Sequence, residues 1–319
     1  MNQSASELYS PQFKQHETSF LHWLQTLGYS PATINTRKRN IKEFLLYLER
    51  CDINTIEQIT SYKASRFVKY LKGRENKLFG SSLMNASINV GISTVNKFIE
   101  YLGQSRQTTT TINKLEYTRE HYKPRNILTL QEINTLYEAT YQQSYFTTPG
   151  AKALQKAVSQ RDRAMLGIYY GCGLRKSEGT GLNVTDILTE RKLIFVRKGK
   201  GCKERYVPIT ANNLDYITDY IHDGREYLLT KSQGNTGAFF ISQSGTPCSD
   251  QALSARLDKL VERSGNSSLQ SKKPTLHTLR HSIATHLFGQ GMDMEMIQQF
   301  LGHATMETTQ IYTHILNER

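Results

Sequence analysis

The stretch TLHTLRHSIATHLF, residues Thr275–Phe288, decides most about how this chain folds. At about 100° per residue, its apolar side chains fall on one narrow arc of a helix, made up of Leu276, Leu279, Ile283 and Leu287. Arg280 lies at the edge of this arc and His277 about 60° beyond it. The stretch therefore predicts a helix that packs on a core, with two polar residues flanking its buried face.

Helical periodicity also dominates the N-terminal third of the chain. Glycine and proline signals divide this region into four expected helices, over residues 11–28, 31–48, 61–72 and 81–102. Basic side chains gather in the first half of the second helix, at Arg37, Lys38, Arg39 and Lys42. The pattern predicts a small basic helical bundle, in which these four residues are the candidates to contact a polyanion such as DNA.

A second domain is expected after a linker. Residues 103–126 are poor in apolar residues and include Thr108–Thr111, so we assign residues 1–104 to a helical domain, 105–126 to a linker and 127–319 to a second domain. Thr129 and Glu132 have the spacing of a capping box at the start of a helix. Further helices are expected over residues 162–172, 250–264, 293–301 and 305–315, short strands at 193–197, 205–209 and 239–241, and a polar segment at 140–156. The fold class is mainly α, with a small antiparallel sheet.

Composition excludes several classes of protein. The chain has 319 residues, of which 38% are hydrophobic and 21% charged, as in folded proteins. Its first twenty residues do not resemble a secretion signal, and no run of about 18 apolar residues predicts a membrane span. The four cysteines are widely separated and form no C-x-x-C motif. We expect a reduced, cytoplasmic setting.

Charge points to a polyanionic partner. The formal net charge is +12, of which residues 1–130 carry +8, from 18 basic and 10 acidic side chains. Such a balance is typical of proteins that bind nucleic acid. On charge alone, a soluble basic protein without such a partner stays an alternative.

The second domain holds residues suited to binding phosphate. These are, in order, Arg175, Lys200, His277, Arg280, His303 and Tyr312. The planar fork of an arginine bonds two phosphate oxygens at once, although an arginine that pairs with a carboxylate is the alternative for each one. The histidines at 277, 281, 286, 303 and 314 have no acidic or cysteine partner at ligand spacing, so no metal site is expected.

Five motifs in sequence order carry a family resemblance. The strings G-C-G-L-R-K-S-E-G, G-K-G-C-K-E-R, H-T-L-R-H-S-I-A-T-H-L, L-G-H and Y-T-H resemble those of the tyrosine recombinase, or phage-integrase, family. The likeness covers residues 127–319 motif by motif, while the first domain is similar only as a basic helical core-binding domain. It implies a DNA strand-exchange enzyme with an α-rich catalytic domain.

The resemblance assigns a role to each residue of the set. Arg175, Arg280 and His303 would stabilise charge on the non-bridging oxygens of a scissile phosphate. Tyr312 would be the nucleophile and form a 3′-phosphotyrosyl link, with His277 taking its proton and Lys200 protonating the 5′ oxygen. Because the covalent link keeps the phosphodiester energy, neither ATP, nor metal, nor another cofactor is expected. Lys198 and Lys203 stay alternatives to Lys200.

Glu178 and its neighbours form the helix that follows Arg175. Glu178 lies three residues after Arg175 and is expected to orient it, with a surface pair as the alternative. Gly179 and Thr180 stand where the family usually has apolar residues, which predicts weaker packing behind Arg175.

The expected partners follow from the resemblance. They are double-stranded DNA, three further copies of the chain in a homotetramer on two recombination sites, and DNA-bending accessory proteins. Only seven residues follow Tyr312, so we expect contacts between protomers to lie mainly elsewhere. A type IB topoisomerase-like enzyme and a catalytically silent DNA-binding regulator are the alternative functions.

Overall fold

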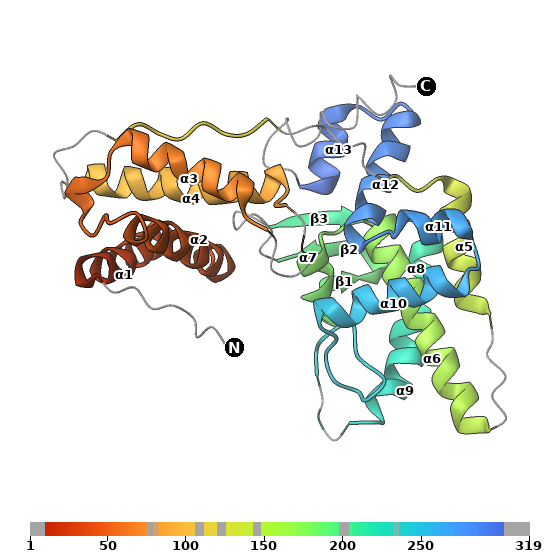
Figure 1. Cartoon of the computed structure of the whole chain (residues 1–319). Coiled ribbons are helices and arrows are strands. Elements are labelled where there is room, and N and C mark those ends of the chain that lie inside the picture. The colour runs from red at the N-terminus through yellow and green to blue at the C-terminus, as the bar shows by residue number, and fades with distance from the viewer. Residues whose placement is uncertain are drawn as a thin grey trace. The chain divides into compact units, whose positions relative to one another are not determined.

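The chain divides into two compact units in its computed structural model. The structure describes residues 10–75, 80, 82–105, 112–119, 126–142, 148–197, 204–232, 234 and 236–302. The units are Met1–Tyr122 and Lys123–Arg319, and each has its own buried core (Figure 1). The division falls within the predicted linker, and the domain bounds given above stay a prediction.

Within the described residues, the first unit is a bundle of four α-helices. They are α1 (Pro11–Thr26), α2 (Pro31–Glu49), α3 (Ser61–Gly73) and α4 (Asn85–Gln104), with a short 3-10 helix η1 (Ile56–Gln58) after α2. Proline begins α1 and α2, and the side chains of Ser10 and Ser30 accept hydrogen bonds from the first turns, so both helices start where the sequence predicts. Figure 1 shows α1 and α2 in one layer and α3 and α4 in another.

Part of the predicted linker packs on this bundle. Ile112 and Leu115 belong to its buried core. The buried Asn96 amide donates to the Leu115 carbonyl at 3.0 Å and accepts from the Leu115 N–H at 2.6 Å. Two apolar side chains and a paired amide therefore hold residues 112–119 in place, although this stretch is too polar overall to predict that from sequence.

The second unit is mainly helical and more irregular. Its helices are α5 (Leu130–Tyr141), α6 (Pro149–Leu166), α7 (Lys176–Thr180), α8 (Ala211–Asp219), α9 (Glu226–Leu229), α10 (Asp250–Arg263), α11 (Ser267–Lys272), α12 (Leu276–Gly289) and α13 (Met294–Leu301). Two π-helical turns, η2 (Gly167–Gly171) and η5 (Tyr220–Arg225), and two 3-10 turns, η3 (Val184–Asp186) and η4 (Thr189–Arg191), lie between them.

The helix boundaries in this unit can be compared with the capping and loop signals predicted from the sequence. The capping box of Thr129 and Glu132 is confirmed. The polar segment predicted at 140–156 is wrong in its second half, because the Thr148 side chain caps α6 and the helix begins at Pro149. The helix predicted at 305–315 lies outside the described residues.

The predicted small antiparallel sheet is confirmed, but one of the three predicted strands is wrong. Its order is β1 (Ile187–Leu188), β2 (Leu193–Val196), β3 (Arg205–Pro208), with Ile194 opposite Val207. The strand predicted at 239–241 is wrong. Those residues form part of the core, where the Ile241 N–H donates to the Tyr220 hydroxyl at 3.1 Å and Ile241 makes only an isolated bridge to Pro247. Burial, not strand pairing, explains this apolar run.

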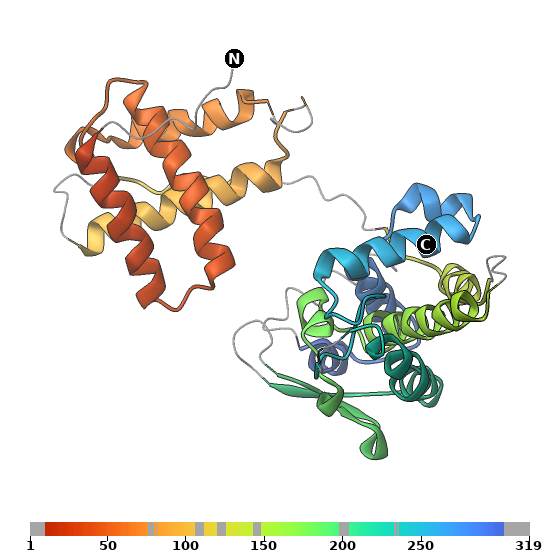
Figure 2. The same cartoon turned by 90° about the horizontal axis from the view of Figure 1, so that it is seen from below.

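The sheet lies beside the helices that carry the phosphate-binding candidates. In Figures 1 and 2, α12 and α13 follow one another at the C-terminal end of the described chain. Arg205 at the start of β3 pairs with Glu178 of α7, which connects the sheet to that helix. None of the described helices is long and apolar enough to cross a membrane.

Candidate active site

Arg280 is a fully buried arginine on α12. Its side chain is 1% exposed, so the helical wheel, which predicts it at the rim of the core, is wrong about its burial. One guanidinium nitrogen, Nη1, donates to the Gly173 carbonyl at 2.5 Å, and Nη2 donates to the Leu301 carbonyl at 2.7 Å. Backbone oxygens can compensate a buried charge, and a helical wheel contains no information about such partners. Arg280 therefore joins the loop before α7 to the end of α13.

Arg175 is held beside the same two segments. It is the N-cap residue of α7, and its N–H donates to Glu178 Oε2 at 2.9 Å. Its guanidinium donates to Glu178 Oε1 at 2.7 Å and to the Gly302 carbonyl at 2.6 Å. The side chain is 20% exposed. Arg175 and Arg280 are thus anchored to the carbonyls of consecutive residues, Gly302 and Leu301.

Two of the residues whose carbonyls accept from these arginines, Gly173 and Gly302, are glycines in the left-handed backbone region. Gly173 has φ of +62° and Gly302 has φ of +63°, which other residues rarely adopt. Space is also limited, since a Cβ on Gly173 would lie 2.9 Å from Leu301 Cδ2. The G-C-G and L-G-H strings are therefore required by the turns that bring the two arginines together.

Glu178 is the buried anion of the site. Its side chain is 3% exposed and pairs with both Arg175 and Arg205. Burial alone raises the pKa of the Glu178 carboxyl, but the hydrogen bonds and charge of Arg205, and then the bonds from Arg175, outweigh burial and lower the pKa to about 2. Glu178 therefore stays ionised at neutral pH and holds Arg175 as the spacing predicts.

Arg205 is the residue of this cluster for which the sequence predicts no role in the site. It is the first residue of β3, and its guanidinium donates two hydrogen bonds to the Glu178 carboxylate. Nη1 donates to Oε1 at 3.0 Å and Nη2 donates to Oε2 at 2.9 Å. A sequence signal was present. Alternation in β3 puts Arg205 on the same face as the buried Val207, and an arginine on a buried face needs an acidic partner.

The helix behind Arg175 is well packed, contrary to the sequence expectation. A Cβ on Gly179 would lie 2.6 Å from the ring of Tyr169, so the glycine lets this buried tyrosine fill the space. The Tyr169 hydroxyl donates to the Lys176 carbonyl at 3.1 Å and lies 3.3 Å from the Thr180 hydroxyl. Gly179 and Thr180 therefore support α7 instead of weakening it.

The remaining predicted site residues differ in what the structure describes. His277 is exposed in the first turn of α12, with its ring centroid 4.4 Å from that of His281. Lys200, His303 and Tyr312, together with the alternatives Lys198 and Lys203, lie outside the described residues. His303 follows Gly302 directly in the chain. The structure thus brings together Arg175, Glu178 and Arg280, and their catalytic roles stay predictions.

The four basic residues predicted to contact DNA do not share one side of α2. Arg37 is half-buried, where it donates to the Ser93 carbonyl at 3.1 Å and lies over the ring of Tyr29. Lys38 and Lys42 lie close enough to Glu17 of α1 for their charges to lower the pKa of its carboxyl in part, although burial raises this pKa overall. Lys38 and Arg39 are exposed.

Comparison with known families assigns both units. Residues 126–319 match the phage integrase family, and residues 18–106 match the phage integrase N-terminal SAM-like domain. The chain belongs to the phage integrase family.

Curated relatives give the activity of this family. The chain is 30% identical to the tyrosine recombinase XerC of Listeria innocua over 311 residues, which cover 95% of this chain and 94% of the relative. It is 32% identical to the tyrosine recombinase XerD of Oceanobacillus iheyensis over 304 residues, with 94% and 93% covered. The protein is therefore a DNA-binding enzyme, a site-specific recombinase of the tyrosine type. These relatives support neither the topoisomerase nor the silent regulator.

Solved structures have the same fold. The Tn1549 transposon integrase in complex with transposon right-end DNA matches with a TM-score of 0.70 at 17% identity, over 94% of each chain. The lambda integrase tetramer bound to a Holliday junction matches with a TM-score of 0.63 at 17% identity, over 95% of this chain and 78% of that one.

The lowered pKa of Glu178 predicts a pH-dependent loss of stability. A carboxyl whose pKa falls from 4.5 to about 2 on folding stabilises the folded state above pH 4.5 and loses this contribution as the pH falls toward 2. The shift corresponds to about 3 kcal/mol at neutral pH. Glu178→Gln should therefore lower the melting temperature at pH 7, and its difference from the parent protein should shrink by more than half by pH 3.

Calorimetry of the full chain between pH 7 and pH 3 checks this prediction. Glu190→Gln, at an exposed position, is the control and should leave the melting temperature unchanged across the range. A Glu178→Gln deficit that is constant with pH would show that Glu178 is not the titrating group.

Proposed function

We propose that Arg175 and Arg280 bind the non-bridging oxygens of a scissile DNA phosphate, with His303 as a third donor. The observation that carries this proposal is their shared anchorage, at the Gly302 and Leu301 carbonyls, in the two residues before His303. Donors held in place before the substrate arrives stabilise the developing charge without reorganising. Three guanidinium charges, including that of Arg205, against the single Glu178 carboxylate leave two positive charges in excess. This excess matches a phosphodiester that gains negative charge during attack.

Tyr312 is the nucleophile in this proposal. Its phenolic oxygen attacks phosphorus, the bond from phosphorus to the 5′ oxygen breaks, and a 3′-phosphotyrosyl link forms. His277 takes the phenolic proton, for which its exposed position on α12 is suitable, and Lys200 donates a proton to the departing 5′ oxygen. A second strand's 5′-hydroxyl reverses the step, so strand exchange needs no ATP and no metal.

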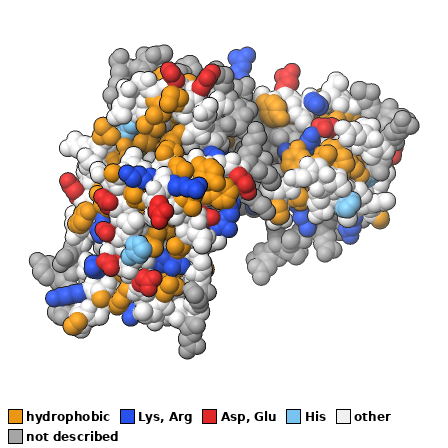
Figure 3. Space-filling model, turned by 180° about the vertical axis from the view of Figure 1, so that it is seen from behind, with side chains coloured by type: hydrophobic (Ala, Val, Ile, Leu, Met, Phe, Trp, Pro, Cys, Tyr) orange, Lys and Arg blue, Asp and Glu red, His pale blue; other side chains and the backbone are white. Residues whose placement is uncertain are grey.

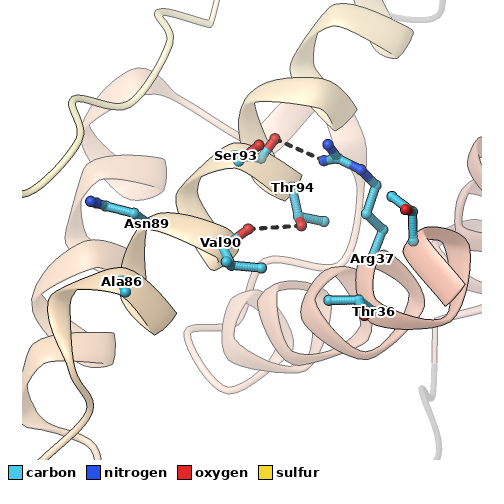
Figure 4. Close-up of a pocket in the computed structure, with 8 residues that line it drawn as sticks. Thr36, Arg37, Ala86, Asn89, Val90, Ser93 and Thr94 are labelled. Atoms are coloured by element: carbon cyan, nitrogen blue, oxygen red, sulfur yellow. Dashed lines mark hydrogen bonds between the residues drawn. The ribbon is translucent and has the colours of Figure 1, made fainter. Parts of the chain in front are cut away.

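The first unit is proposed to bind double-stranded DNA through α2 and α4. A pocket of about 450 Å³ opens between these helices, and its lining includes Thr36, Arg37, Asn89 and Ser93 (Figure 4). Hydroxyl, amide and guanidinium groups are the donors and acceptors that contact base edges in a DNA groove. The exposed Lys38 and Arg39 are suited to phosphate contacts, which supply affinity rather than sequence information.

Basic and acidic side chains are mixed on one face of the second unit. On the face shown in Figure 3, Lys and Arg side chains of the larger unit alternate with Asp and Glu side chains and with apolar areas. The larger net charge of residues 1–130 favours the first unit as the main source of non-specific affinity.

We also propose the assembly and setting of the reaction. Four copies of the chain act on two recombination sites in DNA of the nucleoid, including DNA of mobile elements, with DNA-bending proteins as accessory partners. The lambda integrase tetramer on a Holliday junction, which shares the fold, supports this stoichiometry.

Tyr312→Phe should bind DNA normally and form no covalent adduct, because only the attacking oxygen is lost. A duplex nicked next to the cleavage site traps the adduct, which a denaturing gel then separates from free DNA. Tyr206→Phe removes the hydroxyl of an exposed tyrosine in β3 and should form adduct at the normal rate. Adduct formation by Tyr312→Phe would assign the nucleophile to another residue.

Removing an exposed cation from α2 should lower the salt dependence of DNA binding. Each lost phosphate contact reduces the slope of log affinity against log salt by about 0.9, because one fewer counterion is released. We expect this change for Lys38→Gln and Arg39→Gln in the full chain. Lys231→Gln, at an exposed position two residues after α9, should leave the slope unchanged. Equal slopes for all four proteins would exclude this surface as the phosphate contact.

A further inference from the structure

We propose that Arg205 is a positioning residue for strand cleavage, which fixes Arg175 through Glu178 and ties strand β3 to the end of α13. The inference rests on the proposed function of Arg175. Arg205 is expected to touch neither the nucleophile nor the phosphate, and its effect on the reaction comes through its neighbours.

The first contact is a carboxylate shared by two arginines. Arg205 Nη1 and Arg175 Nη1 both donate to Glu178 Oε1, at 3.0 Å and 2.7 Å. Arg205 Nη2 and the Arg175 backbone N–H both donate to Oε2, each at 2.9 Å. Each oxygen thus receives one bond from each arginine. A rotation of the carboxylate away from Arg205 would move the acceptor that aims the Arg175 guanidinium.

The second contact is with Gly302. A Cβ added there would lie 2.6 Å from Arg205 Nε and 2.7 Å from Arg205 Cδ, so the arginine stem packs directly on this glycine. The Gly302 carbonyl is the other described acceptor of the Arg175 guanidinium. Arg205 therefore contacts both groups that hold Arg175, and its side chain is only 13% exposed.

These contacts connect three segments that carry proposed catalytic residues. Arg205 follows Lys200 by five residues, Arg175 begins α7, and Gly302 immediately precedes His303. A single side chain thus links the strand after Lys200 to the donors for the scissile phosphate. Arg205 is suited to this task because its planar fork places a separate nitrogen on each carboxylate oxygen, whereas a lysine has a single nitrogen on a flexible stem.

A purely stabilising ion pair is the competing explanation. Replacing a whole buried pair by apolar residues often changes stability little, because desolvation offsets most of the attraction, but removing one partner destabilises the fold because it leaves the other charge buried. The chain offers a matched example in the same unit, where Arg256 forks onto the buried Asp162 with Nε at 3.1 Å from Oδ1. None of the bonds described for that pair reaches Arg175, Arg280 or Glu178, so it serves as the control.

The test compares Arg205→Met with Arg256→Met in the full chain. Single-turnover adduct formation on the nicked duplex should be about 10- to 100-fold slower for Arg205→Met, the usual cost of a small misplacement of a reacting group. DNA affinity should change less than about twofold, because Glu178 and not DNA loses a partner. Arg256→Met should cleave at the normal rate below its melting temperature. Arg205→Lys keeps the charge but has one nitrogen in place of the planar fork, so it should fall between the parent protein and Arg205→Met.

A double-mutant cycle with Glu178→Gln distinguishes positioning from independent effects. If Arg205 acts through Glu178, the double variant should cleave no more slowly than the slower single variant. Fold-losses that multiply would overturn the inference, as would normal cleavage by Arg205→Met or an equal loss in Arg256→Met. Arg175→Ala separates this inference from the proposed function. Normal cleavage by Arg175→Ala would refute the role of Arg175 itself, whereas an inactive Arg175→Ala beside a normal Arg205→Met would refute only the role of Arg205.

Discussion

The site depends on the ion pairs of Glu178. Its ionised carboxylate is buried between the guanidinium groups of Arg175 and Arg205. Burial opposes its charge, and only the paired arginines keep its pKa low. The same bonds restrict Arg175 to one orientation before substrate binds. Because two guanidinium groups share one anion, and Arg280 adds a third, the cluster keeps a positive excess. If carboxylates balanced all three guanidinium charges, the cluster would have no positive potential to attract a phosphate.

The fold supplies this arrangement through backbone oxygens as well as side chains. Consecutive carbonyls at the end of α13 receive one arginine each, and Gly302, with positive φ, forms the turn there. Gly173, also with positive φ, supplies the second carbonyl that accepts from Arg280. Carbonyl acceptors hold a guanidinium without cancelling its charge, unlike a carboxylate. The buried Tyr169, seated against Gly179, supports α7 from behind. Packing and electrostatics are therefore specified by the same short motifs.

Local chemistry made much of the fold predictable from the sequence. Capped helices such as α2 and α5 begin where Ser30 and Thr129 predict, since the capping side chain and the backbone N–H that donates to it are neighbours in sequence. Long-range partners were not predictable. The burial of Arg280 depends on carbonyls over twenty residues away, and the role of Arg205 depends on Glu178, 27 residues earlier. The strand predicted at 239–241 failed for the same reason, because an apolar run does not reveal whether it pairs or packs.

The central claim is that Arg175 and Arg280 act on the charge of the non-bridging oxygens. A methylphosphonate at the scissile position removes that charge, so it tests the claim most directly. For Arg175→Met and Arg280→Met, cleavage of the normal phosphate should fall about 10²- to 10³-fold, while the loss on the methylphosphonate should be less than about tenfold, because no charge is left to stabilise. Because both substrates are cleaved by the same preparation of each variant, a smaller fraction of folded enzyme lowers both rates equally and does not change their ratio. An equal loss on both substrates would contradict the account.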